Sequence, residues 1–199
     1  MRVFSYLVSR DWGFAPNPFH GYCTLACCKP TIRRVAQDGD LIVGCGTRGN
    51  KLRGHLIFIM RVTEKVDFAT YWNDPRFQRK KPKHGTSKLA FYGDNIYKPN
   101  GDEYLQIYSH HSLPDGSQNE YNRNKDTGSD HVLISDDYVY FGSNAPAIPS
   151  HLRDFEGVDL CPPTQGHIST KISNEMAEAV LAYFATLQGQ KIRGTPANW

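Results

Sequence analysis

The chain has 199 residues, a formal net charge of +3 and 39% hydrophobic residues. This length fits one domain with a sizeable core, and we predict a single domain over residues 1–199. The 12% aromatic content excludes a disordered chain. No apolar stretch is long enough to span a membrane, and the N-terminus lacks a signal-peptide pattern, which predicts a cytoplasmic protein. In that compartment the five cysteines are expected to be thiols rather than disulfides.

The first third of the chain is predicted to contain strands joined by turns and one short helix. Val3–Ser9 is rich in aromatic and β-branched residues and predicts a strand, and Leu41–Cys45 predicts a buried strand. Pro30–Ala36 predicts a short helix, because proline suits a first helical turn. Gly46–Gly54 is a glycine-rich loop with basic side chains. Leu56–Val66 is apolar at first and then alternates, which predicts one long strand that leaves the core for an edge.

The rest of the chain adds two helices, further strands and a long loop. Asp67 is placed to cap a short helix that carries Phe68, Tyr71 and Trp72. We predict three strands, at Tyr104–Ser109, His131–Ser135 and Tyr138–Phe141. A long polar loop over Ser112–Asp130 is expected between the first and second of them. The clearest helix begins after Ser173, where apolar residues recur at helical spacing. Together these elements predict an α+β fold.

The segment "GFAPNPFHGYCTLACCKPTIRR" holds three of the cysteines. Cys23, Cys27 and Cys28 with His20 could offer ligands to zinc, but structural zinc sites favour two well-separated ligand pairs, and no second pair follows. We therefore predict no metal site and interpret these cysteines as buried structural thiols. A single nucleophile, with Cys23 as the first candidate, stays an alternative that needs a nearby base or cation.

Two histidines stand where a predicted strand gives way to the polar loop, in "SHHSLPDGSQN". Neighbouring strand residues point to opposite faces, so one of His110 and His111 is expected to enter a given pocket. That side chain could act as a general base or bind an anion. The alternative is a strand-end histidine bonded to backbone.

Asp94 and Asn95 lie between aromatic residues in "FYGDNIY". Such side chains can read the edge of a base while aromatic rings stack on its faces. A simple turn also describes Gly93–Asn95 and is the favoured interpretation.

Basic residues occur in two groups, which we interpret either as phosphate contacts or as a solvated surface. The first group is Arg33, Arg34, Arg48, Lys51 and Arg53, and the second is Arg79, Lys80, Lys81, Lys83 and Lys88. Aromatic residues, including Trp72 and Tyr97, are interleaved with the second group. Basic groups among aromatics suit single-stranded or flipped nucleotides better than plain duplex DNA. The chain has no phosphate-cradling lysine motif, dinucleotide fingerprint or serine elbow.

Two resemblances follow from these segments. "DGDLIVGCGT" followed by "GHLIFIMRVTEKVDFATYWNDPRF" resembles the order of elements in EVE-, ASCH- and other PUA-like barrels, over roughly the first 80 residues. This resemblance implies a PUA-like mixed β-barrel with flanking helices, in a class of domains that bind RNA or modified bases. The fold that we predict is therefore such a barrel together with the C-terminal amphipathic helix that the apolar spacing after Ser173 indicates.

The second resemblance covers nearly the whole chain. "SRDWGFAPNPFHGYCTLACCKPTIRR", "GDNIY", "SHHSLPDGSQN", "DHVLISDDYVYFG" and the closing "GTPANW" together resemble the family called nucleotide modification associated domain 2. The resemblance implies a link to base-modification systems of bacteria and phages, without fixing a reaction or catalytic residues.

We therefore predict a nucleic-acid-associated protein that recognises or processes a modified nucleotide base, in a bacterial or phage DNA-modification or defence system. Two alternatives stay open: a base-modifying transferase or nucleoside hydrolase with a Cys/His/Asp pocket, and a non-catalytic subunit of a modification complex. Expected partners are DNA, RNA or a free modified nucleotide and further subunits, with no membrane; no cofactor is assigned. The candidate catalytic residues are Cys23, Asp94, His110 and His111, and the candidate nucleotide-binding residues are Asp11, Asn17, Arg33, Arg48, Trp72, Asn95 and Tyr97.

Overall fold

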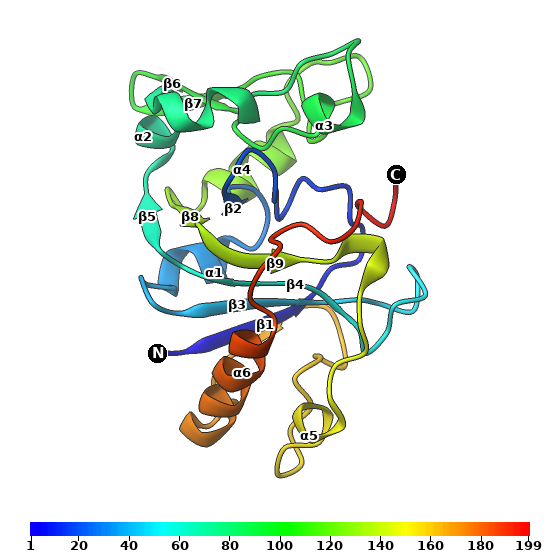
Figure 1. Ribbon diagram of the computed structural model, residues 1–199. Helices are drawn as coiled ribbons and strands as arrows, with labels where there is room; N and C mark the ends of the chain where they lie inside the picture. Colours follow the sequence, from blue (N-terminus) through cyan, green and yellow to red (C-terminus); the bar gives the residue numbers. More distant parts are fainter. The chain divides into compact units, whose positions relative to one another are not determined.

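The computed structural model describes all 199 residues and divides into two compact units whose segments alternate along the chain (Figure 1). Unit 1 consists of Met1–Trp12, Ala36–Thr63 and Asp137–Trp199, and unit 2 consists of Gly13–Val35 and Glu64–Asp136. Each sheet described below lies within one unit. The prediction of one domain over residues 1–199 stays a prediction.

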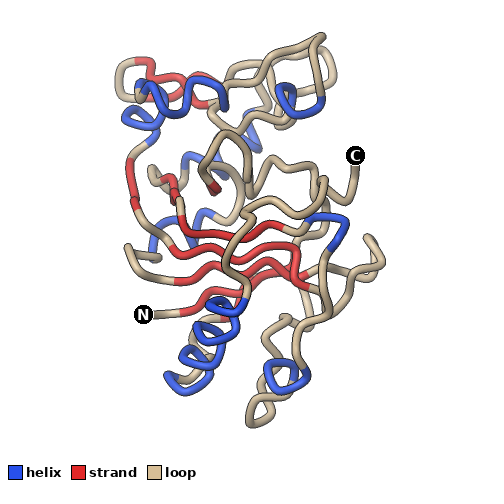
Figure 2. Tube along the Cα trace, in the orientation of Figure 1, coloured by secondary structure: helices blue, strands red, loops and turns tan.

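Unit 1 is built on a five-stranded sheet with the order β10-β1-β3-β4-β9. β1 pairs with β3 in parallel, and every other neighbouring pair is antiparallel. The strands, drawn in red in Figure 2, are β1 (Val3–Leu7), β3 (Leu41–Cys45), β4 (Leu56–Arg61), β9 (Asp137–Tyr140) and β10 (His167–Ile168). β1 and β3 are buried at every position, as expected for near-continuous apolar runs in the centre of a sheet.

Helix α6 (Asn174–Thr186) completes the core of unit 1. Its buried Met176, Val180 and Phe184 belong to the same apolar cluster as side chains of β1, β3 and β4. The side chain of Ser173 accepts a hydrogen bond from the Met176 N–H at 3.2 Å, which confirms the predicted N-cap. The unit also contains η2 (Gly142–Asn144) and α5 (Ser150–Arg153).

Unit 2 has a three-stranded antiparallel sheet of order β2-β8-β5 and a separate hairpin of β6 and β7. The strands are β2 (Cys23–Leu25), β5 (Glu64–Val66), β6 (Tyr97–Asn100), β7 (Glu103–Gln106) and β8 (Val132–Ser135). The helices are α1 (Pro30–Val35), α2 (Phe68–Asn73), η1 (Pro75–Lys80), α3 (Lys88–Phe91) and α4 (Glu120–Thr127). The Asp67 side chain caps α2 by accepting from the Thr70 N–H at 2.6 Å, as predicted.

Two predicted elements are wrong. The expected single strand over Leu56–Val66 is two strands, because β4 ends at Arg61 in the five-stranded sheet and β5 begins at Glu64 in the three-stranded sheet. The expected loop over Ser112–Asp130 contains α4, whose N-cap Asn119 accepts from the Asn122 N–H at 3.1 Å. This helix is polar on all sides, so the apolar spacing that reveals most helices is missing.

The α+β class is confirmed, while the strands form open sheets of five, three and two strands rather than one closed barrel. None of the helices combines the length and the apolar composition that crossing a membrane requires.

Candidate active site

A strained turn joins strand β2 to helix α1 in unit 2. Cys28 and Lys29, the two residues before the helix, have φ angles of 60° and 44°, in the left-handed region that side chains other than glycine seldom adopt. Of the five cysteines, only Cys28 is partly exposed, while the other four are buried. Sharp strand-to-helix turns of this kind lift a nucleophilic side chain out of the surrounding structure in other enzymes.

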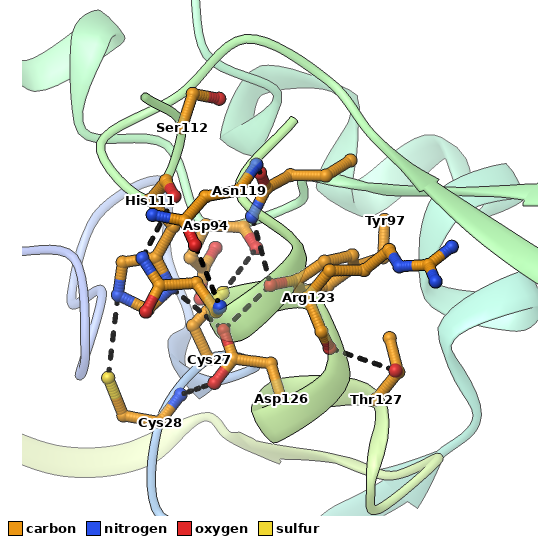
Figure 3. Close-up of polar contacts among 12 residues, drawn as sticks. Cys27, Cys28, Asp94, Tyr97, His111, Ser112, Asn119, Arg123, Asp126 and Thr127 are labelled. Carbon is orange, nitrogen blue, oxygen red and sulfur yellow. Dashed lines mark hydrogen bonds and ion pairs between the residues drawn. The ribbon is translucent and has the colours of Figure 1, made fainter. Parts of the chain in front are cut away.

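Cys28 faces a histidine that is itself bound to a carboxylate (Figure 3). The Nε2 atom of His111 lies 3.6 Å from the Cys28 Sγ, and its Nδ1 lies 2.8 Å from Oδ2 of Asp126. A thiol, a base and a group that orients the base are thus in contact in that order. This is the arrangement by which cysteine and serine nucleophiles are activated on unrelated folds.

Asp126, near the end of α4, is held by three donors. Besides His111, its carboxylate accepts from the Cys28 backbone N–H at 2.7 Å and from the Tyr97 hydroxyl at 2.8 Å. The carboxylate is almost fully buried. Because one oxygen binds the backbone of Cys28 and the other binds the imidazole, Asp126 fixes the positions of the thiol and the base together.

Arg33 supports this turn from inside. The side chain is fully buried in α1, and its guanidinium donates to the carbonyl of Cys28 at 2.8 Å and to that of Ser129 at 2.8 Å. It also donates to the carbonyls of Asp126 and His131, at 2.5 Å each. Every nitrogen of the guanidinium is therefore used on backbone oxygens, which ties the Cys28 turn to the end of α4.

The surroundings of His111 and Asp126 favour the charged form of each side chain. Burial alone would lower the pKa of His111, but its hydrogen bonds to Asp126 and to Cys28 outweigh burial and raise the pKa to about 9. Burial alone would raise the pKa of Asp126, but the hydrogen bond and charge of His111, with further help from Tyr97 and Arg33, lower it below its usual value. At neutral pH the pair is thus an imidazolium and a carboxylate.

This ion pair predicts a falling stability at alkaline pH. Because the pKa of His111 is raised from 6.5 to about 9 on folding, its contribution to stability is complete below pH 6.5 and is lost as the pH rises through about 9. The shift corresponds to about 3 kcal/mol in the free energy of unfolding. Urea unfolding at pH values across this window measures it. His111→Gln should show a flatter dependence, and equal slopes for the two proteins would contradict the assignment.

Three side chains here also have the donor atoms of a metal site. Cys27, His111 and Asp126 each offer one ligand atom, and these atoms lie within 4.8 Å of one another. Burial raises the pKa of the Cys27 thiol, and a metal would have to displace the thiol proton in order to bind. Nδ1 of His111 is already bonded to Asp126. The arrangement fits thiol chemistry better than metal binding.

The sequence-predicted nucleophile, Cys23, lies in strand β2 opposite Ser135 and is fully buried. Burial, the largest influence on this thiol, raises its pKa. A buried, protonated thiol does not suit a nucleophile, which favours the partly exposed Cys28 instead. The sequence signal for Cys28 is its place between a short strand and the Lys29–Pro30 start of a helix.

Three other predicted residues meet inside unit 2, in a fully buried polar network. Asp94 accepts from the Thr24 hydroxyl at 2.6 Å and from the Tyr71 hydroxyl at 2.8 Å. The oxygen of the Asn17 side chain accepts from the Lys80 ammonium at 2.7 Å. Asn95 donates to the Tyr71 carbonyl at 3.0 Å. Asp94, Asn17 and Asn95 thus serve the interior, with no exposed polar atoms to offer a base.

The remaining predicted residues lie elsewhere. In unit 1, Asp11 accepts from the Tyr140 hydroxyl at 2.6 Å and from the Ala197 N–H at 3.0 Å, and Arg48 is exposed in the 46–54 loop. In unit 2, Trp72 is half-buried in α2 with the Lys81 ammonium 3.7 Å from its ring centre. Of the predicted residues, His111, Tyr97 and Arg33 are brought together at Cys28.

Aromatic rings extend from His111. The Phe14 ring centre lies 4.6 Å from that of His111 and 5.3 Å from that of His110, and His110 lies 5.1 Å from Tyr92. Phe14 is buried and the histidines are partly exposed. Aromatic rings thus lie directly beside Cys28, His111 and Asp126, which we call the triad.

The same series of ring contacts ends at an exposed stack. The ring centres of Tyr92 and Phe91 lie 5.0 Å apart, and those of Phe91 and His84 lie 5.1 Å apart. His84 lies parallel to Tyr108, with ring centres 3.8 Å apart and planes 4° apart. Tyr108 is 46% exposed. We name the rings from Phe14 to Tyr108 the aromatic row: Phe14, His84, Phe91, Tyr92, Tyr108 and His110.

Comparison with known families finds a match to the family described as nucleotide modification associated domain 2, and it covers residues 1–199. No curated protein and no solved structure matches the chain. The match confirms the family resemblance of the sequence segments. It includes every residue of the Cys28 site, which consists of Cys28, His111, Asp126, Arg33 and Tyr97. The chain belongs to the nucleotide modification associated domain 2 family.

Proposed function

We propose that this protein transfers or removes an acyl group on a nucleotide base, with Cys28 as the nucleophile, His111 as the acid and base, and Asp126 as the orienting carboxylate. The observation that carries the proposal is the contact of these three groups at a strained turn, with the thiol partly exposed. The family supports a role in nucleotide modification. Triads of this composition act on carbonyl carbon in other folds, which supports acyl chemistry.

The reaction can be written with these groups alone. The thiolate of Cys28, paired with the imidazolium of His111, attacks the carbonyl carbon of an ester or amide, and a thioester forms. The bond from that carbon to the leaving oxygen or nitrogen breaks, and the leaving group takes its proton from His111. Water or an amine then attacks the thioester and gives a proton back to His111. The acyl product leaves, and the thiolate is restored.

The aromatic row supports a base as the group that binds beside the triad. Purine and pyrimidine rings stack on aromatic side chains irrespective of sequence. Basic Lys83 and Lys88 are exposed on the same segment as His84 and Phe91, where they suit phosphates of DNA, RNA or a free nucleotide. We propose such ligands as the partners.

A PUA-like relationship is part of the proposal. It is supported by the "DGDLIVGCGT" segment, in which strand β3 follows the "GD" turn and is followed by a loop and β4, in the order that the resemblance implies. An experimental structure with a bound modified base would test this relationship through the position of that base.

The experiment is a trapping assay. The protein is mixed with nucleosides and oligonucleotides that carry an ester or amide on the base, and with unmodified counterparts, and its intact mass is measured over time. We expect an acyl adduct from modified substrates alone, which peptide mapping places on Cys28. Loss of the acyl group from the nucleotide should accompany it.

Two outcomes would overturn the proposal. Tight binding of a modified base with neither adduct nor turnover would favour non-catalytic recognition. Turnover that a chelator abolishes, and that zinc restores, would favour a metal site at Cys27, His111 and Asp126 instead.

A further inference from the structure

Unit 1 contains a cavity that the Cys28 site does not involve. Its volume is about 550 Å³, within the range of pockets that hold small molecules. Three segments form its walls: the end of β1 with Ser9, the loop from Thr47 to Arg53, and Pro163–Gln165. No carboxylate lines the cavity, whereas Arg48 and Arg53 both do.

The arginines leave positive charge available in this cavity. Arg48 is exposed, and its guanidinium has neither a hydrogen-bond acceptor nor a carboxylate partner. The Arg53 guanidinium donates one hydrogen bond to the carbonyl of Pro162, at 3.0 Å, and forms no ion pair. Two guanidinium groups without a counter-charge attract an anion, and their fork of donors matches the oxygens of a phosphate.

The loop that carries the arginines is held in one shape by its own hydrogen bonds. The Asn50 side-chain oxygen accepts from the Thr47 N–H at 2.8 Å, and its amide donates to the Val8 carbonyl at 3.1 Å. Gly46 is required at the start, because a Cβ there would lie 2.2 Å from the Leu52 carbonyl oxygen. A loop ordered before binding loses less entropy when a ligand arrives.

The other walls are linked to this loop. The Arg53 bond to Pro162 joins the loop to the 162–165 segment, and the Gln165 amide donates to the Ser9 hydroxyl across the cavity. Ser9, Thr47 and Thr164, which carry hydroxyl groups, also line the cavity, together with the apolar residues Leu7 and Pro163. Charge for a phosphate and apolar surface for a base or sugar are thus combined in one cavity.

From this geometry we infer that the cavity of unit 1 binds the phosphate end of a nucleotide through Arg48 and Arg53. The site uses none of the residues of the proposed thiol chemistry, so it stands or fails separately. The phosphate belongs either to a free nucleotide or to a nucleic-acid backbone, and the test separates these sources.

The test measures binding by calorimetry for four probes: inorganic phosphate, a nucleoside 5′-monophosphate, the same nucleoside, and a short oligonucleotide. Arg48→Gln removes the charge at an exposed position and should weaken binding of the phosphate-bearing probes by about tenfold or more. Lys51→Gln is the matched control, since Lys51 is exposed in the same loop but does not line the cavity, and it should bind as wild type does.

The outcomes divide clearly. Binding of the monophosphate but not the nucleoside, with loss in Arg48→Gln alone, supports the site with a free nucleotide as its ligand. The same pattern for the oligonucleotide alone supports the site with backbone phosphate as its ligand. Equal weakening in both variants, equal binding of nucleoside and monophosphate, or no binding of any phosphate-bearing probe would overturn the inference.

Discussion

Replacing Cys28 by serine should lower the turnover of an acylated nucleotide by about three orders of magnitude or more. A serine hydroxyl is of similar size, but it is far less acidic than a thiol, and the turn would no longer supply a nucleophile at neutral pH. Cys28 is partly exposed, so the change removes little packing. The measurement is the rate of acyl loss from the substrate identified in the trapping assay, with saturating substrate.

The control for this variant is Thr31→Ala, an exposed position in the first turn of α1. It changes the same helix without touching the triad, and its rate should equal that of wild type. Far-ultraviolet circular dichroism and urea unfolding should show the Cys28→Ser fold to be intact. A folded Cys28→Ser protein with wild-type turnover would exclude Cys28 as the nucleophile.

Replacing Arg33 by alanine should cost about 4 kcal/mol in the free energy of unfolding. The change removes donors from four buried backbone carbonyls, of Cys28, Asp126, Ser129 and His131, and leaves a large cavity. It also removes the positive charge that helps to lower the pKa of the buried Asp126. Urea unfolding at neutral pH measures the loss, and an unfolded variant would be an extreme form of the same result.

The adjacent Arg34 provides a matched control. It is exposed, so Arg34→Ala should change the free energy of unfolding by less than about 0.5 kcal/mol. Arg33→Lys tests the geometry, since an ammonium is a point donor and cannot reach all four carbonyls as a planar fork does. Equal stabilities of Arg33→Ala and Arg34→Ala would contradict the positioning role.

Local sequence patterns correctly predicted the elements whose structure does not depend on which other segment of the chain packs against them. Leu41–Cys45 is a buried strand because it is apolar throughout, and Asp67 and Ser173 begin helices because their side chains reach a free N–H. The prediction of a single strand over Leu56–Val66 was wrong, because the residue pattern of this segment is that of a strand along its whole length. Nothing local records that the chain changes sheets after Arg61.

The site was harder to predict than the fold because its residues come from segments that lie far apart along the chain. His111 is a candidate from the predicted strand Tyr104–Ser109 before it, but its carboxylate partner lies in α4, a polar helix within a segment that the sequence predicts to be a loop. Periodicity cannot reveal a helix without an apolar face. The choice among the cysteines depended on burial, since Cys23 is fully buried in strand β2 and Cys28 is partly exposed in the turn before α1. That difference is set by tertiary packing.

The most direct test of the Cys28–His111–Asp126 site is the rate at which iodoacetamide alkylates each cysteine as a function of pH. In the native protein, Cys28 should react first among the five thiols, and all five should react after unfolding in guanidinium. Because His111 contacts the Cys28 thiol and its pKa is raised to about 9, a positive charge lies beside the thiol at pH 7, and wild-type Cys28 should react there. His111→Gln removes this charge, and its Cys28 should react about tenfold more slowly at pH 7. Equal rates and pH profiles for the two proteins, or faster reaction at another cysteine, would contradict the account.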